Sequence, residues 1–255
     1  MNTMAPVQEL RSLEKLREQE LEEARSIQSV MLPAESLRAG AVTVSHEFQP
    51  IEMVGGDFLD YFVLADGKIG LYLGDVSGKG LPATLYAALA VGTLRGVHKT
   101  GLLPNEVLAT LNERLTMRGI VQRHAAIQYA VFDPDRSEMR IASAGMPGPM
   151  HFSANGCRVL ELSDIPPGLF VGVNYENSVL SLQPGDAVLF YTDGIADALN
   201  ANGEEFGVER LQAICADRKG FSSKELLSRI FSTVADFVGS RERHDDMAAA
   251  LFTYE

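Results

Sequence analysis

The residues of this chain that could do chemistry are aspartates placed where apolar runs begin or end. In LYLGDVSGKG an apolar run stops at Asp75 and a glycine-rich turn follows. VGGDFLDYF places Asp57 after paired glycines and before a strand-like run, and AVLFYTDGIADA ends another apolar run at Asp193. RHDDMAAALF puts Asp245 and Asp246 just before the last apolar run. One aspartate in a glycine turn is ordinary turn chemistry, but four such acidic segments indicate a shared function.

The charge of the carboxylates indicates what this function is. Like charges brought together at the edges of one sheet system repel each other unless cations lie between them. Separated carboxylates on strand ends suit hard divalent cations such as Mg²⁺ or Mn²⁺, which take oxygen ligands and keep several waters. The pattern is typical of a hydrolase that uses two metal ions.

The same segments carry a family resemblance. GGDFLDYF, GDVSGKG, YTDGIADA and HDDMA, in this order, resemble the motifs of the PPM (PP2C-like) metal-dependent serine/threonine phosphatases. More narrowly, ARSIQSVMLP followed by GGDFLDYF is similar to the bacterial SpoIIE-type branch, whose members regulate sigma factors. The resemblance extends from about Glu23 to Glu255, and four ordered motifs are far more specific than any one of them.

The resemblance implies a set of metal ligands for two divalent cations, Mn²⁺ or Mg²⁺. Asp75 is expected to bridge both ions, and Asp57 with the backbone carbonyl of Val76 to hold one of them. The second ion falls to Asp193 and Asp245. The four aspartates would then be catalytic through metal-bound water, which attacks the phosphorus in line without a covalent phospho-enzyme.

One acid of the last motif has two interpretations. Asp246 stands where the family often has Asn or Asp, and it is either a further metal ligand or a solvated or supporting residue. Asp60, Asp186 and Asp197 are nearby acids that we interpret as structural or exposed.

Several positions depart from the family pattern. Ser77 stands where eukaryotic members carry a His that is a candidate general acid, and FQPIEMVGGD has no clear counterpart of their phosphate-binding Arg. Arg241, Arg243 and His244 lie beside the last acidic pair and either bind phosphate or are charges on an exposed loop. Met146 replaces the His of a family turn that usually contains AGH.

Composition limits the class of protein. The 255 residues are 46% hydrophobic, enough for a large core, and the formal net charge of −12 argues against nucleic acid as a partner. Cys157 and Cys215 are too few for a disulfide framework or a zinc site, and neither lies in an anion-binding loop. No apolar run approaches the ~20 residues that span a bilayer, and the signal-peptide pattern is missing, so we expect a cytoplasmic protein without a membrane partner.

The N-terminal segment predicts one long helix. VQELRSLEKLREQELEEARSIQSVML lacks Gly and Pro and ends at Pro33. Its apolar residues fall mostly at spacings of three and four, with Arg17 interrupting the seam. The helix is either a coiled coil that forms a homodimer or an amphipathic helix lying on its own domain. We therefore divide the chain into residues 1–33, a helical linker, and residues 34–255, a phosphatase domain.

The remaining pattern predicts an α+β fold. Alternation and turn signals predict strands at 42–50, 57–75 with a hairpin turn at Asp66-Gly67, 125–133, 138–145, 149–153, 157–162, 178–182, 187–191 and 247–253. Helices are expected at 81–98, 104–115, 208–216 and 222–237, and the paired prolines of IPPGLFVG predict an irregular segment. Strands with helices segregated between them favour an αββα sandwich of two mainly antiparallel sheets flanked by helices, with an N-terminal helical extension.

These observations lead to a metal-dependent phosphoserine/phosphothreonine phosphatase as the first hypothesis. The family resemblance implies a bacterial signalling protein as substrate, of the STAS-type anti-sigma-factor antagonist kind. The alternative is a catalytically weak module of the same fold that binds a phosphoprotein. A two-metal phosphodiesterase or nuclease would need a basic surface for its polyanionic substrate, which this acidic chain lacks.

Overall fold

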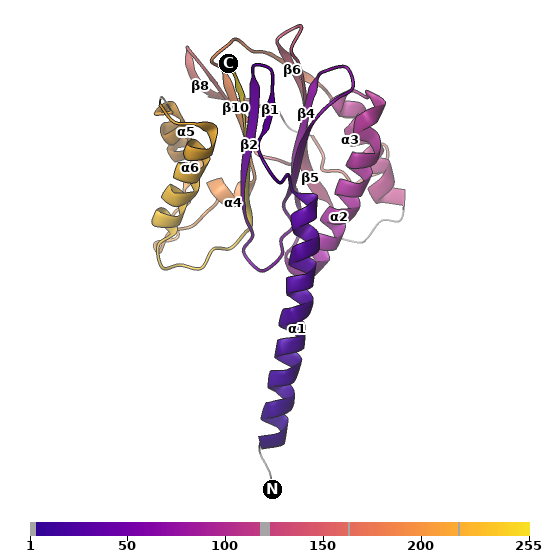
Figure 1. The fold of residues 1–255 in the computed structure, drawn as a ribbon, viewed down its shortest axis with the longest axis vertical. Coiled ribbons are helices and arrows are strands. Elements are labelled where there is room, and N and C mark those ends of the chain that lie inside the picture. The colour runs from indigo at the N-terminus through magenta and orange to yellow at the C-terminus, as the bar shows by residue number, and fades with distance from the viewer. Residues whose placement is uncertain (1–3, 118–122, 163, 219) are drawn as a thin grey trace.

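Two β-sheets face each other at the centre of the molecule, and helices cover their outer faces (Figure 1). The computed structural model describes residues 4–117, 123–162, 164–218 and 220–255. Neighbouring strands pair antiparallel throughout both sheets of the described chain. The predicted αββα sandwich is therefore confirmed.

The first sheet combines the two ends of the domain. Its order is β1 (Leu37–Ala39), β2 (Val42–Gln49), β11 (Met247–Tyr254), β10 (Ala187–Tyr191), β7 (Met150–Ser153) and β8 (Gly156–Val159). The second sheet follows the chain more closely, in the order β3 (Phe58–Val63), β4 (Ile69–Val76), β5 (Ala125–Asp133), β6 (Glu138–Ala144) and β9 (Ser178–Ser181).

Two pairs of helices flank the sandwich, and one long helix extends from it. The second sheet is covered by α2 (Gly80–Val97) and α3 (Pro104–Met117), with a 3₁₀ turn, η1 (His98–Thr100), between them. The first sheet is covered by α5 (Gly207–Ala216) and α6 (Ser223–Val238). Helix α1 (Met4–Met31) projects far beyond the sandwich, with the N-terminus at its distal end (Figure 1).

The strands sort their side chains by alternation. On β10, Val188 and Phe190 face the opposite sheet, whereas Leu189 and Tyr191 face α5 and α6. The same alternation along the other strands produces three apolar layers, one between the sheets and one under each helical pair. The sheets are therefore buried on both faces, as the long apolar runs indicate.

The sequence-based boundaries differ from the structure at a few places. Strand β1 and the single-turn helix α4 (Asp193–Ala196) were not predicted, and the strand expected at 157–162 ends at Val159. Strand β4 continues to Val76, one residue beyond the expected end at Asp75, because both residues pair with β5. Asp75 is thus held on a regular strand and not in a loop.

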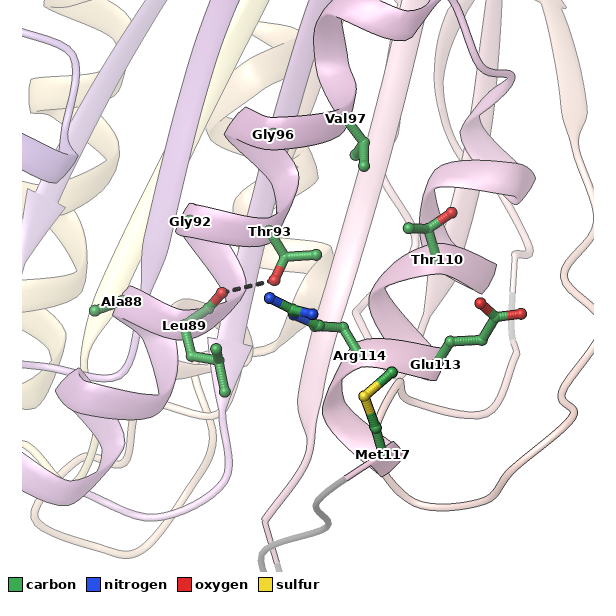
Figure 2. Close-up of a pocket in the computed structure, with 10 residues that line it drawn as sticks. All are labelled: Ala88, Leu89, Gly92, Thr93, Gly96, Val97, Thr110, Glu113, Arg114 and Met117. Atoms are coloured by element: carbon green, nitrogen blue, oxygen red, sulfur yellow. Dashed lines mark hydrogen bonds between the residues drawn. The ribbon is translucent and has the colours of Figure 1, made fainter.

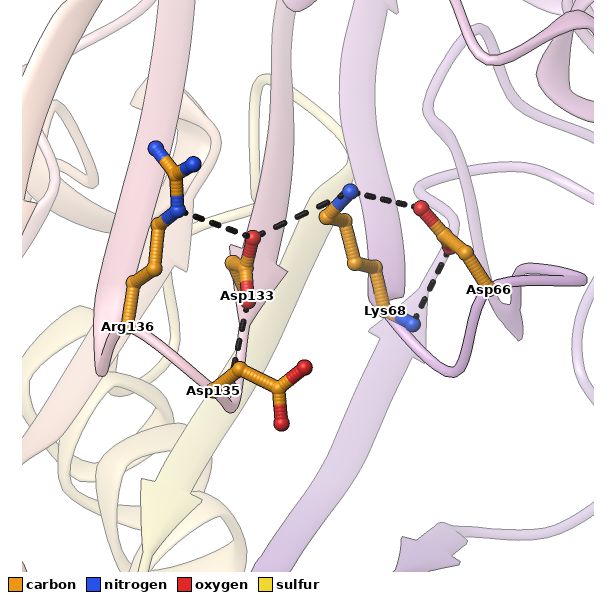
Figure 3. A network of polar contacts seen from close by, with 5 residues as sticks. All are labelled: Asp66, Lys68, Asp133, Asp135 and Arg136. Atoms are coloured by element: carbon orange, nitrogen blue, oxygen red, sulfur yellow. Dashed lines mark hydrogen bonds and ion pairs between the residues drawn. The ribbon is translucent and has the colours of Figure 1, made fainter.

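Charged residues join the hairpin turns at the end of the second sheet opposite Asp57 and Asp75. Lys68 Nζ lies 2.6 Å from Asp66 Oδ2 and 3.8 Å from Asp133 Oδ2, and Arg136 Nε lies 3.9 Å from the same Asp133 oxygen (Figure 3). Exposed pairs of this kind contribute about 0–1 kcal/mol each, so they support the turns without determining the fold. Among the helices of the described chain, none combines the length and apolar character required to cross a bilayer.

Candidate metal centre

Asp57 and Asp75 lie side by side at the open end of the second sheet. Phe58 pairs with Gly74 in the β3–β4 register, so residues 57 and 75 occupy the next pair of positions along the two strands. Asp57 is two residues from Leu59 and Asp75 is two residues from Leu73, so they share the face of these leucines, which face the space between the sheets. The two carboxylates therefore point into the gap between the sheets, at the edge where the apolar layer ends.

The first sheet brings its acids to the same edge. Asp193 begins α4 directly after β10, and Asp245 and Asp246 come just before β11, which pairs with β10. A Cβ on Gly194 would lie well under 3.0 Å from the Asp246 carbonyl oxygen and 3.3 Å from Asp245 Cβ. Only a glycine allows these two segments to approach so closely.

Thr192 connects the two sheets through Asp57. Its hydroxyl donates to Asp57 Oδ2 at 2.8 Å and accepts from the backbone N–H of Ala248 at 2.9 Å. Both Thr192 and Asp57 are buried, so this hydrogen bond determines how the Asp57 carboxylate is oriented. Sequence reasoning missed Thr192; the available signal was a hydroxyl directly before Asp193, in step with the inward-facing Val188 and Phe190 of β10.

Asp246 binds the loop that leads to Asp57. Its Oδ1 accepts from Ile51 N at 2.7 Å and its Oδ2 accepts from Gly56 N at 2.6 Å. The carboxylate is buried and packs against Gly55, where a Cβ would overlap it. These contacts favour the supporting interpretation of Asp246 over the ligand interpretation.

Helix α1 reaches the same loop through Gln28. The buried Gln28 amide donates from Nε2 to Gly55 O at 2.8 Å and accepts from Gly55 N at 3.1 Å. Thr84 of α2 also donates to Gly55 O, at 3.0 Å. Sequence reasoning missed Gln28, although an amide within the apolar stripe that contains Ala24 and Met31 was a usable signal.

Burial and mutual repulsion raise the carboxyl pKa values at this edge. Burial raises the pKa of Asp57 well above its usual range, and the charges of Asp75 and Asp246 act in the same direction. Burial, followed by repulsion from Asp193 and Asp245, raises the pKa of Asp75 to about 7, opposed by a hydrogen bond to Asp57. Desolvation and the charge of Asp245 also raise the pKa of Asp193. The cluster therefore holds more negative charge than its surroundings stabilise.

The donor set fits hard divalent cations. Carboxylate oxygens and a backbone carbonyl are the ligands that Mg²⁺ and Mn²⁺ prefer. The Val76 carbonyl oxygen and Asp75 Oδ1 both border Gly56, at 3.0 and 3.5 Å from the position of a Cβ there. Within the described part of the chain, no three acidic, imidazole or thiol side chains yet converge on one point. Metal binding would therefore have to draw the carboxylates together, against the repulsion that the cations neutralise.

The remaining candidates from the sequence have other contacts. Arg243 donates to the carbonyls of Gln49 and Pro50, and Arg241 donates to the carbonyl of Asn200. These bonds favour structural roles for both guanidinium groups over phosphate binding. Met146 is buried in the layer between the sheets.

Ser77 and the acids interpreted as structural also have partners. Ser77 donates its N–H to His124 O and accepts from His124 N, both at 3.1 Å. Asp60 pairs with Arg95 at 2.8 Å, and Asp186 is buried against His151 Nε2 at 3.0 Å. The structural interpretation of Asp60 and Asp186 is confirmed.

A groove on the outer surface lies away from the acidic edge. It has a volume of about 630 Å³ and runs between the C-terminal halves of α2 and α3, where Gly92 and Gly96 face Thr110, Arg114 and Met117 (Figure 2). Its lining includes Glu113 but none of the aspartates of the four motifs. This groove is therefore separate from the candidate metal centre.

Comparison with known proteins gives consistent results. Residues 65–255 match the family of stage II sporulation protein E (SpoIIE). The chain is 26% identical to the phosphoserine phosphatase RsbU of Bacillus subtilis over 251 residues, which are 94% of this chain and 71% of RsbU.

Solved structures share the fold. The SiaA-PP2C domain of Pseudomonas aeruginosa superimposes with a TM-score of 0.85 at 22% identity, over 95% of this chain and 99% of that domain. The structure of RsbX in complex with magnesium has a TM-score of 0.67 at 14% identity, over 87% and 99% of the two chains.

Proposed function

Because the chain belongs to the SpoIIE family, we propose that it is a Mn²⁺- or Mg²⁺-dependent phosphatase that hydrolyses phosphoserine or phosphothreonine on another protein. One observation carries the proposal: aspartates from four distant segments meet at one edge of the sandwich, where burial and repulsion raise the pKa values of Asp57, Asp75 and Asp193. RsbU, a phosphoserine phosphatase, and RsbX, which binds magnesium, support the same activity and cofactor.

The ligand assignment follows the positions of these acids. Asp75 lies next to Asp57 and is repelled by Asp193 and Asp245, which supports its assignment as the ligand of both ions. Asp57 and the Val76 carbonyl would hold one ion, and Asp193 with Asp245 the other. Asp246, with both oxygens bonded to backbone N–H groups, would support the site by holding the loop at Gly56.

The protein's own part in the reaction is orientation and charge. Divalent cations bound there would supply a water of lowered pKa and neutralise charge on the phosphoryl oxygens. Thr192 and Asp246 fix the segments that carry Asp57, and Gly194 keeps Asp193 near Asp245. Cys157 is half-buried and Cys215 is buried, and burial raises the pKa of both thiols, which disfavours a cysteine nucleophile.

An assay on three substrates tests the function. Purified protein is incubated with an aryl phosphate, a bis-aryl phosphodiester and a phosphoserine peptide, each with Mn²⁺ or with a chelator. We expect Mn²⁺-dependent release of phosphate from the two monoesters only. Binding of the peptide without hydrolysis would instead identify the phosphoprotein-binding module, and cleavage of the diester would identify a phosphodiesterase.

Thr192 provides a prediction about metal affinity. Replacing Thr192 by Val removes the hydrogen bond to Asp57 but keeps the side-chain shape, and we expect the Mn²⁺ concentration for half-maximal activity to rise about 10–100-fold. Thr192→Ser restores the hydroxyl and should stay close to the wild type. A Val variant with an unchanged Mn²⁺ titration would contradict the orienting role.

The substrate and compartment are inferred from the family. We propose a phosphorylated STAS-type signalling protein as the substrate, because residues 65–255 match the SpoIIE family and the motifs of the chain resemble those of SpoIIE-type phosphatases. We also propose the cytoplasm as the compartment of the chain.

Helix α1 is proposed to form a homodimer that tunes activity. Leu13 and Leu16 are exposed on the part of α1 that leaves the sandwich, so this part does not lie on its own domain (Figure 1). At the other end, Gln28 binds Gly55 and Arg95 donates to Met31 O at 2.8 Å. A change in helix pairing can thus reach the loop before Asp57, provided that two arrangements of the helix exist.

Two variants separate the pairing of two α1 helices from the contact between α1 and the loop before Asp57. Leu13→Ser/Leu16→Ser should convert a dimer to a monomer, as measured by mass in solution. Gln28→Ala should leave the oligomeric state unchanged but raise the Mn²⁺ requirement, because the buried Gly55 N–H loses its partner at a cost of about 1–3 kcal/mol. Deleting residues 1–30 should produce both effects. The regulatory proposal would be refuted if the deleted chain kept both the oligomeric state and the Mn²⁺ titration of the wild type.

A further inference from the structure

Three consecutive apolar residues are exposed in the segment between β8 and β9. Leu169 is 42% exposed, Phe170 62% and Val171 79%. We refer to these three residues as the 169–171 tip. Single exposed apolar residues are normal on a protein surface, but an uninterrupted run that includes a phenylalanine is a candidate interaction site.

The structure holds the backbone of the 169–171 tip in place. Asn112 of α3, 2% exposed, accepts from Gly168 N and donates to Phe170 O, both at 2.9 Å. Gly168 and Gly172 adopt φ angles of +98° and +70°, which favour glycine and let the chain turn on either side. Because the buried Asn112 amide binds the backbone at Gly168 and at Phe170, the fold itself holds these apolar residues at the surface.

The 169–171 tip follows a segment that lies at the same end of the second sheet as the candidate metal centre. Pro167 O accepts from Ala125 N at 3.0 Å, and Ala125 pairs with Val76 across β4 and β5. Adjacent strands are ≈ 4.8 Å apart, which places Pro167 about 10 Å from Val76. On the same side, the Arg123 guanidinium donates to Ser77 O and covers Gly78. The positively charged Arg123 side chain therefore lies between the turn that follows Asp75 and the 169–171 tip.

We propose that the 169–171 tip binds apolar side chains that flank the phosphorylated residue of the protein substrate. This inference depends on the proposed phosphatase activity. A segment whose phosphoserine reaches Asp75 extends ≈ 3.3 Å per residue, so a few residues span the roughly 10 Å from Val76 to Pro167, two residues before the 169–171 tip. Arg123 offers a positive charge to the phosphorylated segment next to the acidic edge. Three side chains make a small contact, which suits a transient enzyme–substrate encounter.

The test uses two phosphoserine peptides that differ only in their flanks. One carries Leu, Ile and Phe within five residues of the phosphoserine, and the other carries Ser and Asn at the same positions. With Mn²⁺, the wild type should have a kcat/KM about tenfold higher on the apolar peptide. Phe170→Ser/Val171→Ser should reduce that ratio to about one.

The matched control is Val63→Ser. Val63 is 50% exposed at the end of β3 remote from Asp57, and its replacement should keep the wild-type ratio. A wild type without preference, or a double variant that keeps it, would overturn the inference. Failure to hydrolyse either peptide would instead refute the phosphatase activity itself.

A binding measurement makes the result independent of turnover. The chain contains no tryptophan, so Phe170→Trp introduces a single reporter on the 169–171 tip. Its emission should shift to shorter wavelength when the apolar peptide is added without metal, and should not shift with the polar peptide. An unchanged emission at saturating apolar peptide would also contradict the inference.

Discussion

Replacing Asp75 by Ala should abolish cation-dependent phosphatase activity while the chain stays folded. Asp75 lies next to Asp57 and within the electrostatic influence of Asp193 and Asp245, so no neighbouring side chain could replace the bridging contacts proposed for it. Loss of a supporting residue costs 10–100-fold, and loss of a bridging ligand should exceed about 100-fold. The measurement is hydrolysis of an aryl phosphate across a Mn²⁺ titration.

The same variant should be more stable than the wild type in the absence of metal. Repulsion from Asp193 and Asp245 acts on the ionised Asp75 carboxylate, and its removal relieves that strain. A gain of about 1 kcal/mol would raise the melting temperature by about 2–4 °C. Asp66→Asn, at the opposite end of the same hairpin, is the control and should change neither property. Activity of Asp75→Ala within a few-fold of the wild type would disprove the bridging role.

Replacing Gly194 by Ala should disrupt the site through the backbone. The new Cβ would overlap the Asp246 carbonyl oxygen, a backbone atom that cannot move without displacing the start of β11. Overpacking of this kind costs about 3 kcal/mol when the neighbour is rigid, and we expect the melting temperature to fall by about 6 °C or more. Activity should fall further than stability alone explains, because Asp193 and Asp245 are forced apart.

Gly92→Ala is the control for the glycine substitution. A Cβ at Gly92 meets no atom within 4 Å, and alanine is a better helix former than glycine, so α2 should be unchanged or slightly stabilised. If Gly194→Ala melted like Gly92→Ala and kept its activity, the close approach of α4 to Asp246 would not matter to the site.

Much of the fold follows from local pattern. The alternation around Val188 and Phe190 predicts β10 with the observed bounds, and the Asp66-Gly67 turn predicts the β3–β4 hairpin. Local pattern did not reveal β1 or α4, since three residues of strand or one turn of helix carry too little periodicity to recognise.

The sequence by itself determined which residue types gather at the acidic edge, because aspartates next to apolar runs are a property of the chain read in order. The assignment of these aspartates as metal ligands stays a prediction.

Only the tertiary structure decided what each acid contacts. The hydrogen bond from Thr192 to Asp57 joins residues 135 positions apart, and Asp246 binds Gly56 across 190 positions. Gln28 likewise meets Gly55 only after α1 has docked. Hydrogen bonds of this kind depend on which strands become neighbours in the two sheets, and the pattern along one strand does not record its neighbour.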